Sequence, residues 1–358
     1  MTVKVSRPSI DIRGTLDELN KPSGIAGNAM LAAETPQEQF NLIGAGRRNL
    51  IINGGFDVWQ RGVTGSQANQ AAYISADRWL TYIDTNSTVY LSKVSFALGQ
   101  TDVEGNPESY AKFDWLGTGS TALKVIEQRV ENVILVSGAP ITLSFYARTE
   151  QADDVEIRFT QDNGVGGSAQ VGITGGTVDC TTSWKKFTKT ITLPSLAGKT
   201  VNAGSYLKVG FWSQGTLNSH LELANVQLEL GSVATDFEHR SYGEELALCQ
   251  RYYQQVGGYA HNSYAIGQFY TSYVGRCMLH FEEMRIAPTI SSNAPENFGA
   301  WNAAATTLEL TALSFIDTTV RNTMCQVSRT SGGFVAGNVA VLKDDGINTS
   351  RIYLDAEL

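Results

Sequence analysis

Residues 139–149 read APITLSFYART, and this stretch decides the fold class. Its apolar side chains fall on every second position, at Ile141, Leu143, Phe145 and Ala147. Successive side chains of a β-strand point to opposite faces of a sheet, so a period of two indicates a strand with one buried face. The stretch therefore predicts an antiparallel sheet whose other face meets solvent.

The same alternation recurs further along the chain, in DVEIRFT (154–160) and LKVGFW (207–212). Links rich in Gly, Pro, Asn and Ser, such as 160–170 and 193–205, separate these segments. Many short strands with such links are typical of a β-sandwich or jelly roll. In LELANVQLEL (221–230) the apolar phase slips by one residue near Ala224 and Asn225, which predicts a β-bulge.

One segment, YGEELALCQRYYQQV (242–256), has a helical period instead. Its apolar residues follow alternating spacings of four and three, a seam two heptads long. The pattern allows two interpretations: a single helix packed on its own sandwich, or a short bundle around an oligomer axis. In the second interpretation Leu246, Cys249 and Tyr253 face the axis.

The two ends of the chain differ from each other. After Gly257 and Gly258 the alternation returns, in GRCMLHFEEM (275–284) and RIYLDAEL (351–358), which predicts a second β-sandwich. Residues 1–48 have few aromatic side chains and nearly balanced charges, so they cannot bury a core of their own. We expect these residues to form an arm that orders against a partner.

Composition excludes several classes of function. The chain of 358 residues carries 27 basic and 35 acidic side chains, a net charge of −8, and we find no basic stripe for nucleic acid. The four cysteines form no C-x-x-C pair, which predicts free and mostly buried thiols. No apolar run is long enough to span a membrane, and the N-terminus does not resemble a signal peptide, so we expect no membrane insertion.

Catalytic signatures are also missing from the sequence. The four histidines show no metal-ligand spacing, and there is no G-x-S-x-G, H-E-x-x-H or P-loop motif. Paired acids such as Asp153–Asp154 are adjacent in sequence, so on a strand they point to opposite faces, unlike a glycosidase pair. We therefore expect a protein that is not an enzyme.

Several sequence segments, taken in their order along the chain, resemble those of bacteriophage tail fibres and receptor-binding proteins. They run from NLIINGGFDVWQRG (49–62) through YISADRWL (73–80) and ELANVQLELGSVATDFEHRSYGEELALCQRYYQ (222–254) to the terminal IYLDAEL (352–358). The resemblance implies that residues 49–240 form a jelly roll similar to a carbohydrate-binding module. It also implies a homotrimer located in the virion tail and assembled in the host cytoplasm.

The resemblance further implies roles for residues around the opening phrase. The segment Leu50–Ile52 is the expected first strand, the two following glycines turn at positive φ, and Phe56 and Trp59 reach the core. Arg78 and Trp79 are expected to be structural, with Arg78 bridging to a carboxylate. Many modules of this kind hold a structural calcium ion, and we expect no other cofactor. The candidate calcium ligands here are Asn53, Asp57 and Asn225, although Asn225 stands where the family has an acid.

Glycan recognition commonly uses aromatic faces with amide and hydroxyl partners. The tip segment YAHNSYAIGQFYTSY (259–273) is rich in both. The candidate glycan-binding residues are Tyr259, Tyr264, Phe269, Tyr270, Tyr273, Trp301 and, in the jelly roll, Trp212.

The sequence thus predicts a mainly β protein in four parts: an extended virion-anchoring arm (1–48), a jelly-roll sandwich (49–240), a connecting helix at an oligomer axis (241–257) and a receptor-binding β-sandwich tip (258–358). The predicted function is a phage tail fibre that binds a bacterial surface polysaccharide and attaches to tail or adaptor proteins through residues 1–48. Two alternatives remain: an adaptor or spacer without receptor specificity, and an enzyme that trims polysaccharide.

Overall fold

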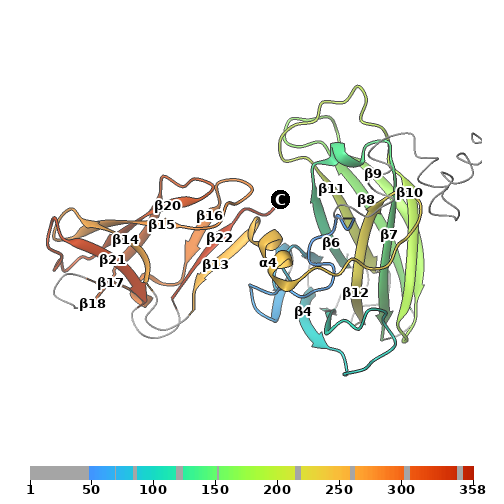
Figure 1. Cartoon of the computed structure of the whole chain (residues 1–358), viewed down its shortest axis with the longest axis horizontal. Helices are drawn as coiled ribbons and strands as arrows, with labels where there is room; N and C mark the ends of the chain where they lie inside the picture. Colours follow the sequence, from blue (N-terminus) through green and yellow to red (C-terminus); the bar gives the residue numbers. More distant parts are fainter. Residues whose placement is uncertain are drawn as a thin grey trace, which may run out of the picture. The chain divides into compact units, whose positions relative to one another are not determined.

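The structure is a computed structural model that describes residues 48–68, 70–83, 87–117, 124–150, 153–213, 219–258, 263–301, 307–344 and 350–358. Residues 51–358 form one compact unit. Their described part is mainly β-strand with a single α-helix (Figure 1), which confirms the predicted fold class. No helix in this part has the length and apolar character needed to cross a membrane. The predicted arm, except Arg48, lies outside the described residues.

Two six-stranded antiparallel sheets build the predicted jelly-roll sandwich. The first sheet has the order β1 (Thr64–Ala68), β4 (Ser87–Ser95), β5 (Ser109–Gly117), β12 (Ser219–Leu230), β7 (Pro140–Thr149) and β10 (Lys185–Thr192). The second has the order β2 (Ala71–Tyr73), β3 (Leu80–Ile83), β6 (Lys124–Glu131), β11 (Tyr206–Ser213), β8 (Asp153–Asp162) and β9 (Val171–Cys180). A short 3-10 helix, η1 (Val133–Val136), follows β6.

Aromatic side chains from both sheets fill the space between them. Phe145 of β7 meets Phe211 of β11 edge to face, with ring centroids 4.9 Å apart. Phe56 stacks on Trp79 at 5.0 Å, and all four rings are buried. Each such ring contributes roughly 1.5–3 kcal/mol by leaving water. The expectation that Phe56 and Trp79 are core residues is confirmed, and Trp59 is also buried.

The opening turn differs from its prediction in two ways. Residues 50–52 form no strand, and the positive φ angles fall on Asn53 (58°) and Phe56 (57°) rather than on the glycines. The Asn53 side chain sets this geometry, because its Oδ1 accepts hydrogen bonds from the amides of Asp57 and Val58, both at 2.9 Å. Gly55 is needed for space instead, since a Cβ there would lie 2.8 Å from an Asp57 carboxylate oxygen.

The predicted β-bulge in β12 is confirmed. Its register with β7 shifts between Ala224 and Gln227, and Asn225 has a φ of 48°. The shift frees the amide of Val226, which donates to the carbonyl of Gly54 at 2.9 Å. The bulge therefore ties the last strand of the sandwich to the opening turn.

The helix α4 (Tyr242–Gln250) is shorter than predicted. Ser241 and Glu244 form a capping box at its start. Glu245 and Cys249 are its buried residues, and Glu245 accepts a hydrogen bond from the Asn53 amide at 2.5 Å. The helix thus packs on its own chain, as the first of the two interpretations proposed.

The predicted oligomer axis is therefore wrong. Tyr253 is not helical but begins β13 (Tyr253–Gly257), because the segment pairs with β22 (Arg351–Asp355). Cys249 and Tyr253 are buried within the chain itself, so neither can face a second copy. The third residue of the predicted axis, Leu246, is half-buried. The connecting helix consequently ends at Gln250 rather than at residue 257.

Two further sheets build the C-terminal sandwich. The larger has the order β18 (Thr307–Glu309), β17 (Phe298–Trp301), β21 (Val339–Asp344), β14 (Ser263–Phe269), β15 (Val274–His280), β20 (Asn322–Ser328) and β19 (Ala312–Ile316). The smaller has the order β13, β22 and β16 (Thr289–Ser292), and a 3-10 turn, η2 (Pro295–Asn297), precedes β17. Phe298 and Leu342 of the larger sheet share one core with Ile352 and Leu354 of the smaller, which confirms a second sandwich.

Candidate functional site

The structure separates the predicted glycan-binding residues into buried and exposed groups. The prediction for Phe269 is wrong: this side chain is fully buried and stacks on Phe334 with centroids 4.2 Å apart, so it cannot meet a ligand. Tyr264 is half-buried, with its hydroxyl bonded to Ser350 and its ring against Phe298. Tyr259 lies outside the described residues.

Three candidates in the tip are open to solvent. Tyr270, Tyr273 and Trp301 are 55%, 53% and 43% exposed. Tyr270 and Tyr273 lie in the turn between β14 and β15, whereas Trp301 ends β17 on the far side of β21. They do not form one cluster, and the guanidinium of Arg276 lies 5.5 Å from the Tyr270 ring centroid.

Trp212 lies on the second sheet of the jelly roll, away from the other candidates. The Arg158 guanidinium stacks 3.8 Å from its ring centroid, and Arg158 pairs with Glu156 at 2.7 Å. The indole lies over Gly210, where an added Cβ would be 3.1 Å from its Nε1. The ring is therefore already stacked within the sheet.

The three candidate calcium ligands lie around the opening turn and the bulge. Asn53 uses its side-chain oxygen for two backbone amides, and the Asn225 amide nitrogen donates to the Glu104 carbonyl at 2.9 Å. Burial raises the pKa of the Asp57 carboxyl, while Lys93 opposes this rise. Among the described residues no three His, Cys, Asp or Glu side chains cluster in a way that could hold a metal. The expectation of no cofactor, with these three residues as the candidate ligands should calcium bind, stays a prediction.

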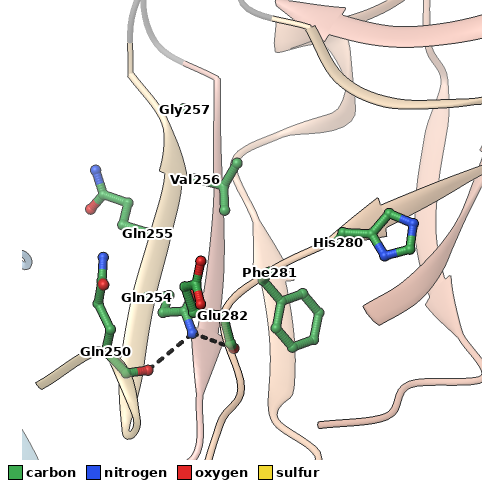
Figure 2. Close-up of a pocket in the computed structure, with 8 residues that line it drawn as sticks. All are labelled: Gln250, Gln254, Gln255, Val256, Gly257, His280, Phe281 and Glu282. Carbon is green, nitrogen blue, oxygen red and sulfur yellow. Dashed lines mark hydrogen bonds between the residues drawn. The ribbon is translucent and has the colours of Figure 1, made fainter. Parts of the chain in front are cut away.

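The larger of two notable hollows lies in the C-terminal part, with a cavity volume of about 510 Å³. Figure 2 shows its lining, which comes from the end of α4, from β13 and from the end of β15. The lining residues are Gln250, Gln254, Gln255, Val256, Gly257, His280, Phe281 and Glu282. We call this hollow the amide pocket, since three of its eight residues are glutamines.

One glutamine holds the walls of the amide pocket together. Gln254 is buried, and its Nε2 donates to the carbonyls of Gln250 at 3.0 Å and Glu282 at 2.8 Å, as the dashed lines in Figure 2 mark. The neighbouring Gln255 amide lies between the Gln60 carbonyl at 3.1 Å and the Arg351 Nε at 2.9 Å. The Gln254 contact with Glu282 fixes β13 against the segment that follows β15, and the Gln255 contacts join β13 to Gln60 and Arg351.

The other polar groups of the amide pocket are not engaged. Within the described residues the side chains of Gln250, His280 and Glu282 make no hydrogen bond; His280 and Glu282 are exposed, and Gln250 is half-buried. Figure 2 places His280 and Phe281 on the opposite wall from the glutamines. The pocket thus offers donors, acceptors and an aromatic ring, the combination that binds hydroxyl-rich molecules.

A second hollow of about 340 Å³ lies against the first sheet of the jelly roll. Its lining residues are Glu104, Gly105, Ser144, Tyr146, Lys186, Asn225, Asp236, Phe237 and His239. Here Lys186 and Glu104 are already paired: Lys186 Nζ lies 2.9 Å from the Glu104 carboxylate, and this hydrogen bond raises the pKa of Lys186. We therefore give the amide pocket precedence as the candidate site.

Sequence reasoning does not find the pocket residues Gln250, Gln254, His280 and Phe281. The heptad pattern favours a helix over residues 250–256, and the alternation favours a strand that continues through HFEEM. The run YYQQV carries the signal that could have corrected this, because two tyrosines and a valine favour a strand over a helix. A strand there places its glutamines on a sheet edge.

Comparisons with known proteins found no matching family model and no matching curated protein. Solved structures with partial similarity to the chain do exist. The enzymatically active domain of tailspike protein 4 from bacteriophage CBA120 matches 51% of this chain and 21% of its own, at 10% identity and a TM-score of 0.31. The CBM22-1 and GH10 modules of Clostridium thermocellum endo-1,4-β-D-xylanase 10B, complexed with xylohexaose, match 54% of this chain and 30% of their own. The identity is 8% and the TM-score is 0.33.

A third similar structure is TmCBM61 in complex with β-1,4-galactotriose. It matches 52% of this chain and all of its own, at 14% identity and a TM-score of 0.30. The chain thus spans only about a fifth of the tailspike domain's length. At TM-scores this low the three similarities carry no argument about function, so the assignment of the β-sandwich rests on the strand pairing described above.

Proposed function

We propose that this chain is a bacteriophage tail fibre that binds a bacterial surface glycan in the amide pocket. The observation that carries the proposal is the set of polar side chains without a hydrogen bond, Gln250, His280 and Glu282, which line the pocket together with Phe281. The volume of about 510 Å³ lies within the range of small-molecule sites, roughly 300–1,000 Å³. The sequence segments between Asn49 and Leu358 that resemble those of tail fibres support this assignment.

The mechanism needs no bond making. Sugar hydroxyls replace water as partners of the Gln250 amide and the His280 imidazole, while the sugar C–H face packs on Phe281. The pocket is open, so one copy binds weakly, with a Kd on the order of a millimolar. Several copies on one fibre would raise the apparent affinity by roughly 10²–10⁴-fold. We propose a homotrimer in the virion tail, assembled in the host cytoplasm and attached to tail proteins through residues 1–48.

A panel of immobilised bacterial surface polysaccharides tests this function. We expect the wild-type chain to bind at least one of them and to release no reducing sugar. The double variant Gln250→Ala, His280→Ala should bind at least about tenfold more weakly, equivalent to about 1.4 kcal/mol.

The matched control is Gln170→Ala, His239→Ala, which removes an exposed amide and an exposed imidazole from the jelly roll. Unchanged binding by the control supports the amide pocket. Loss in the control alone would move the site to the jelly roll, where His239 lines the second hollow. Failure to bind any polysaccharide would favour the adaptor alternative, and release of reducing sugar would favour the enzyme.

A further inference from the structure

Six apolar side chains form one unbroken row across the seven-stranded sheet. The strand register sets each beside the next: Trp301 opposite Val341, Val341 opposite Ile266, Ile266 opposite Met278, Met278 opposite Met324, and Met324 opposite Ile316. They come from β17, β21, β14, β15, β20 and β19, one from each strand. We call them the apolar row.

The apolar row lies on the outer face of the sheet. The strand neighbours of Met278 and Met324, namely Cys277, Leu279 and Cys325, are buried in the shared core. Successive side chains alternate between faces, so the row points away from that core. Ile266 is 64% exposed, Trp301 is 43% exposed, and the other four are half-buried. An antiparallel sheet with one solvated face normally carries polar side chains there.

The face is large enough for a stable contact. Strands lie about 4.8 Å apart and rise about 3.3 Å per residue, so seven strands of up to seven residues cover on the order of 600 Å². A specific interface buries roughly 600–1,000 Å² on each partner. Adjacent apolar side chains on an exposed sheet face are a common mark of an interaction site.

We propose that the apolar row is the surface through which the copies of this chain associate in the proposed homotrimer. The composition argues for another apolar face rather than a sugar, because five of the six side chains are aliphatic or methionine. This inference deepens the proposed function, on which it rests, by naming the interface between copies, and it replaces the helix seam that burial excludes.

Charge on this face also favours self-association. A contact between identical surfaces brings charges close to their own copies, which is unfavourable for like charges. The apolar row carries none, and the two rows that flank it hold one Lys or Arg each, Arg276 on one side and Lys343 on the other. The row that holds Arg276 is, in register order, Val339, Gln268, Arg276, Gln326 and Ser314.

Light scattering coupled to size-exclusion chromatography tests the interface on the full chain. We expect wild type to elute at a multiple of the 38.8 kDa chain mass. Ile266→Arg should elute at the mass of one chain, because it places a charge in the centre of the contact while leaving the core untouched. Leu98→Arg is the matched control, since Leu98 is fully exposed in a jelly-roll loop, and it should keep the wild-type mass.

A circular dichroism spectrum unchanged by Ile266→Arg shows that the variant is folded, and Trp301→Arg repeats the test at the end of the row. A wild-type mass of one chain at about 100 μM, a concentration that populates even weak complexes, would overturn the proposal. So would a folded Ile266→Arg chain with the wild-type mass. Glycan binding by Ile266→Arg is measured separately on the polysaccharide panel. If this variant loses glycan binding but keeps the wild-type mass in light scattering, the face binds sugar and the interface is refuted.

Discussion

Arg78 and Glu357 lie 279 residues apart in the sequence and form a buried ion pair. This finding bears out the expectation that Arg78 bridges to a carboxylate. The Arg78 guanidinium also stacks 3.5 Å from the ring centroid of Tyr252, and Arg61 stacks equally close on Tyr253. Arg61 Nη2 lies 3.3 Å from the other Glu357 oxygen. Two arginines of the jelly roll thus contact the side-chain carboxylate of Glu357 and the rings of two consecutive tyrosines.

We expect Glu357→Gln to destabilise the chain strongly. The change leaves the Arg78 charge buried and unpaired, which costs about 3–5 kcal/mol in comparable cases. Urea unfolding measures this as a lower free energy of unfolding. Glu283→Gln is the control, because Glu283 pairs with Arg321 on the surface, and its unfolding midpoint should match wild type. Equal midpoints for both variants would contradict a stabilising role for Glu357.

The Asp77 carboxyl should make stability depend on pH. Burial raises its pKa from an ordinary 3.8 to about 6, against the opposing effects of Arg61 and Gln60. The folded state therefore binds this proton more tightly than the unfolded state. The contribution of the Asp77 carboxyl to the free energy of unfolding is full below pH 3.8 and is lost as the pH rises through 6. We expect wild type to lose stability relative to Asp77→Asn between about pH 4 and about pH 7. A constant difference between the two unfolding free energies over that interval would refute the shift.

Gly267 in β14 should tolerate no side chain. A Cβ at this position would collide with the Arg276 carbonyl oxygen of the paired strand β15. We expect Gly267→Ala to cost about 1–3 kcal/mol, the usual range for overpacking, and to lower the melting temperature. Gly172→Ala in β9 is the comparison, since nothing lies within 4 Å of its Cβ. Similar melting temperatures for the two variants would show that β14 and β15 do not approach so closely.

The cysteines should be unreactive in the folded chain. All four are free and buried, as the sequence predicted for the thiols. Cys277 and Cys325 lie directly opposite each other, and burial raises their pKa values to about 11 and about 12. Titration with a thiol reagent at neutral pH should be as slow as unfolding, whereas denaturant should release four thiols at once. A rapid phase in the native protein would contradict this burial.

The sequence predicted the elements whose signals are local. The alternation around Phe145 located β7, and the phase slip at Asn225 located the bulge, because both are set by neighbouring side chains. The end of α4 could not be read in this way. The heptad pattern continues through Tyr253, but that residue joins a strand whose partner, Asp355, lies about a hundred residues on. Only the pairing decides between helix and strand there.

The candidate site could not be predicted for the same reason. Gln254 and Glu282 meet through a hydrogen bond between segments far apart in the sequence, and no local pattern marks them as neighbours. The prediction relied on aromatic residue type instead, and Phe269 shows the weakness of that rule, since ring type alone does not tell the inner face of a strand from the outer. The anchoring role of residues 1–48 stays a prediction.

Hydrogen exchange with the polysaccharide that binds in the panel tests the central claim most directly. Bound glycan should slow exchange in peptides covering Gln250–Gly257 and His280–Glu282, and the jelly-roll sheets should exchange as they do without ligand. That result would place the glycan in the amide pocket. Protection confined to the jelly roll, or to the turn carrying Tyr270 and Tyr273, with no change at Gln250 or His280, would contradict the account.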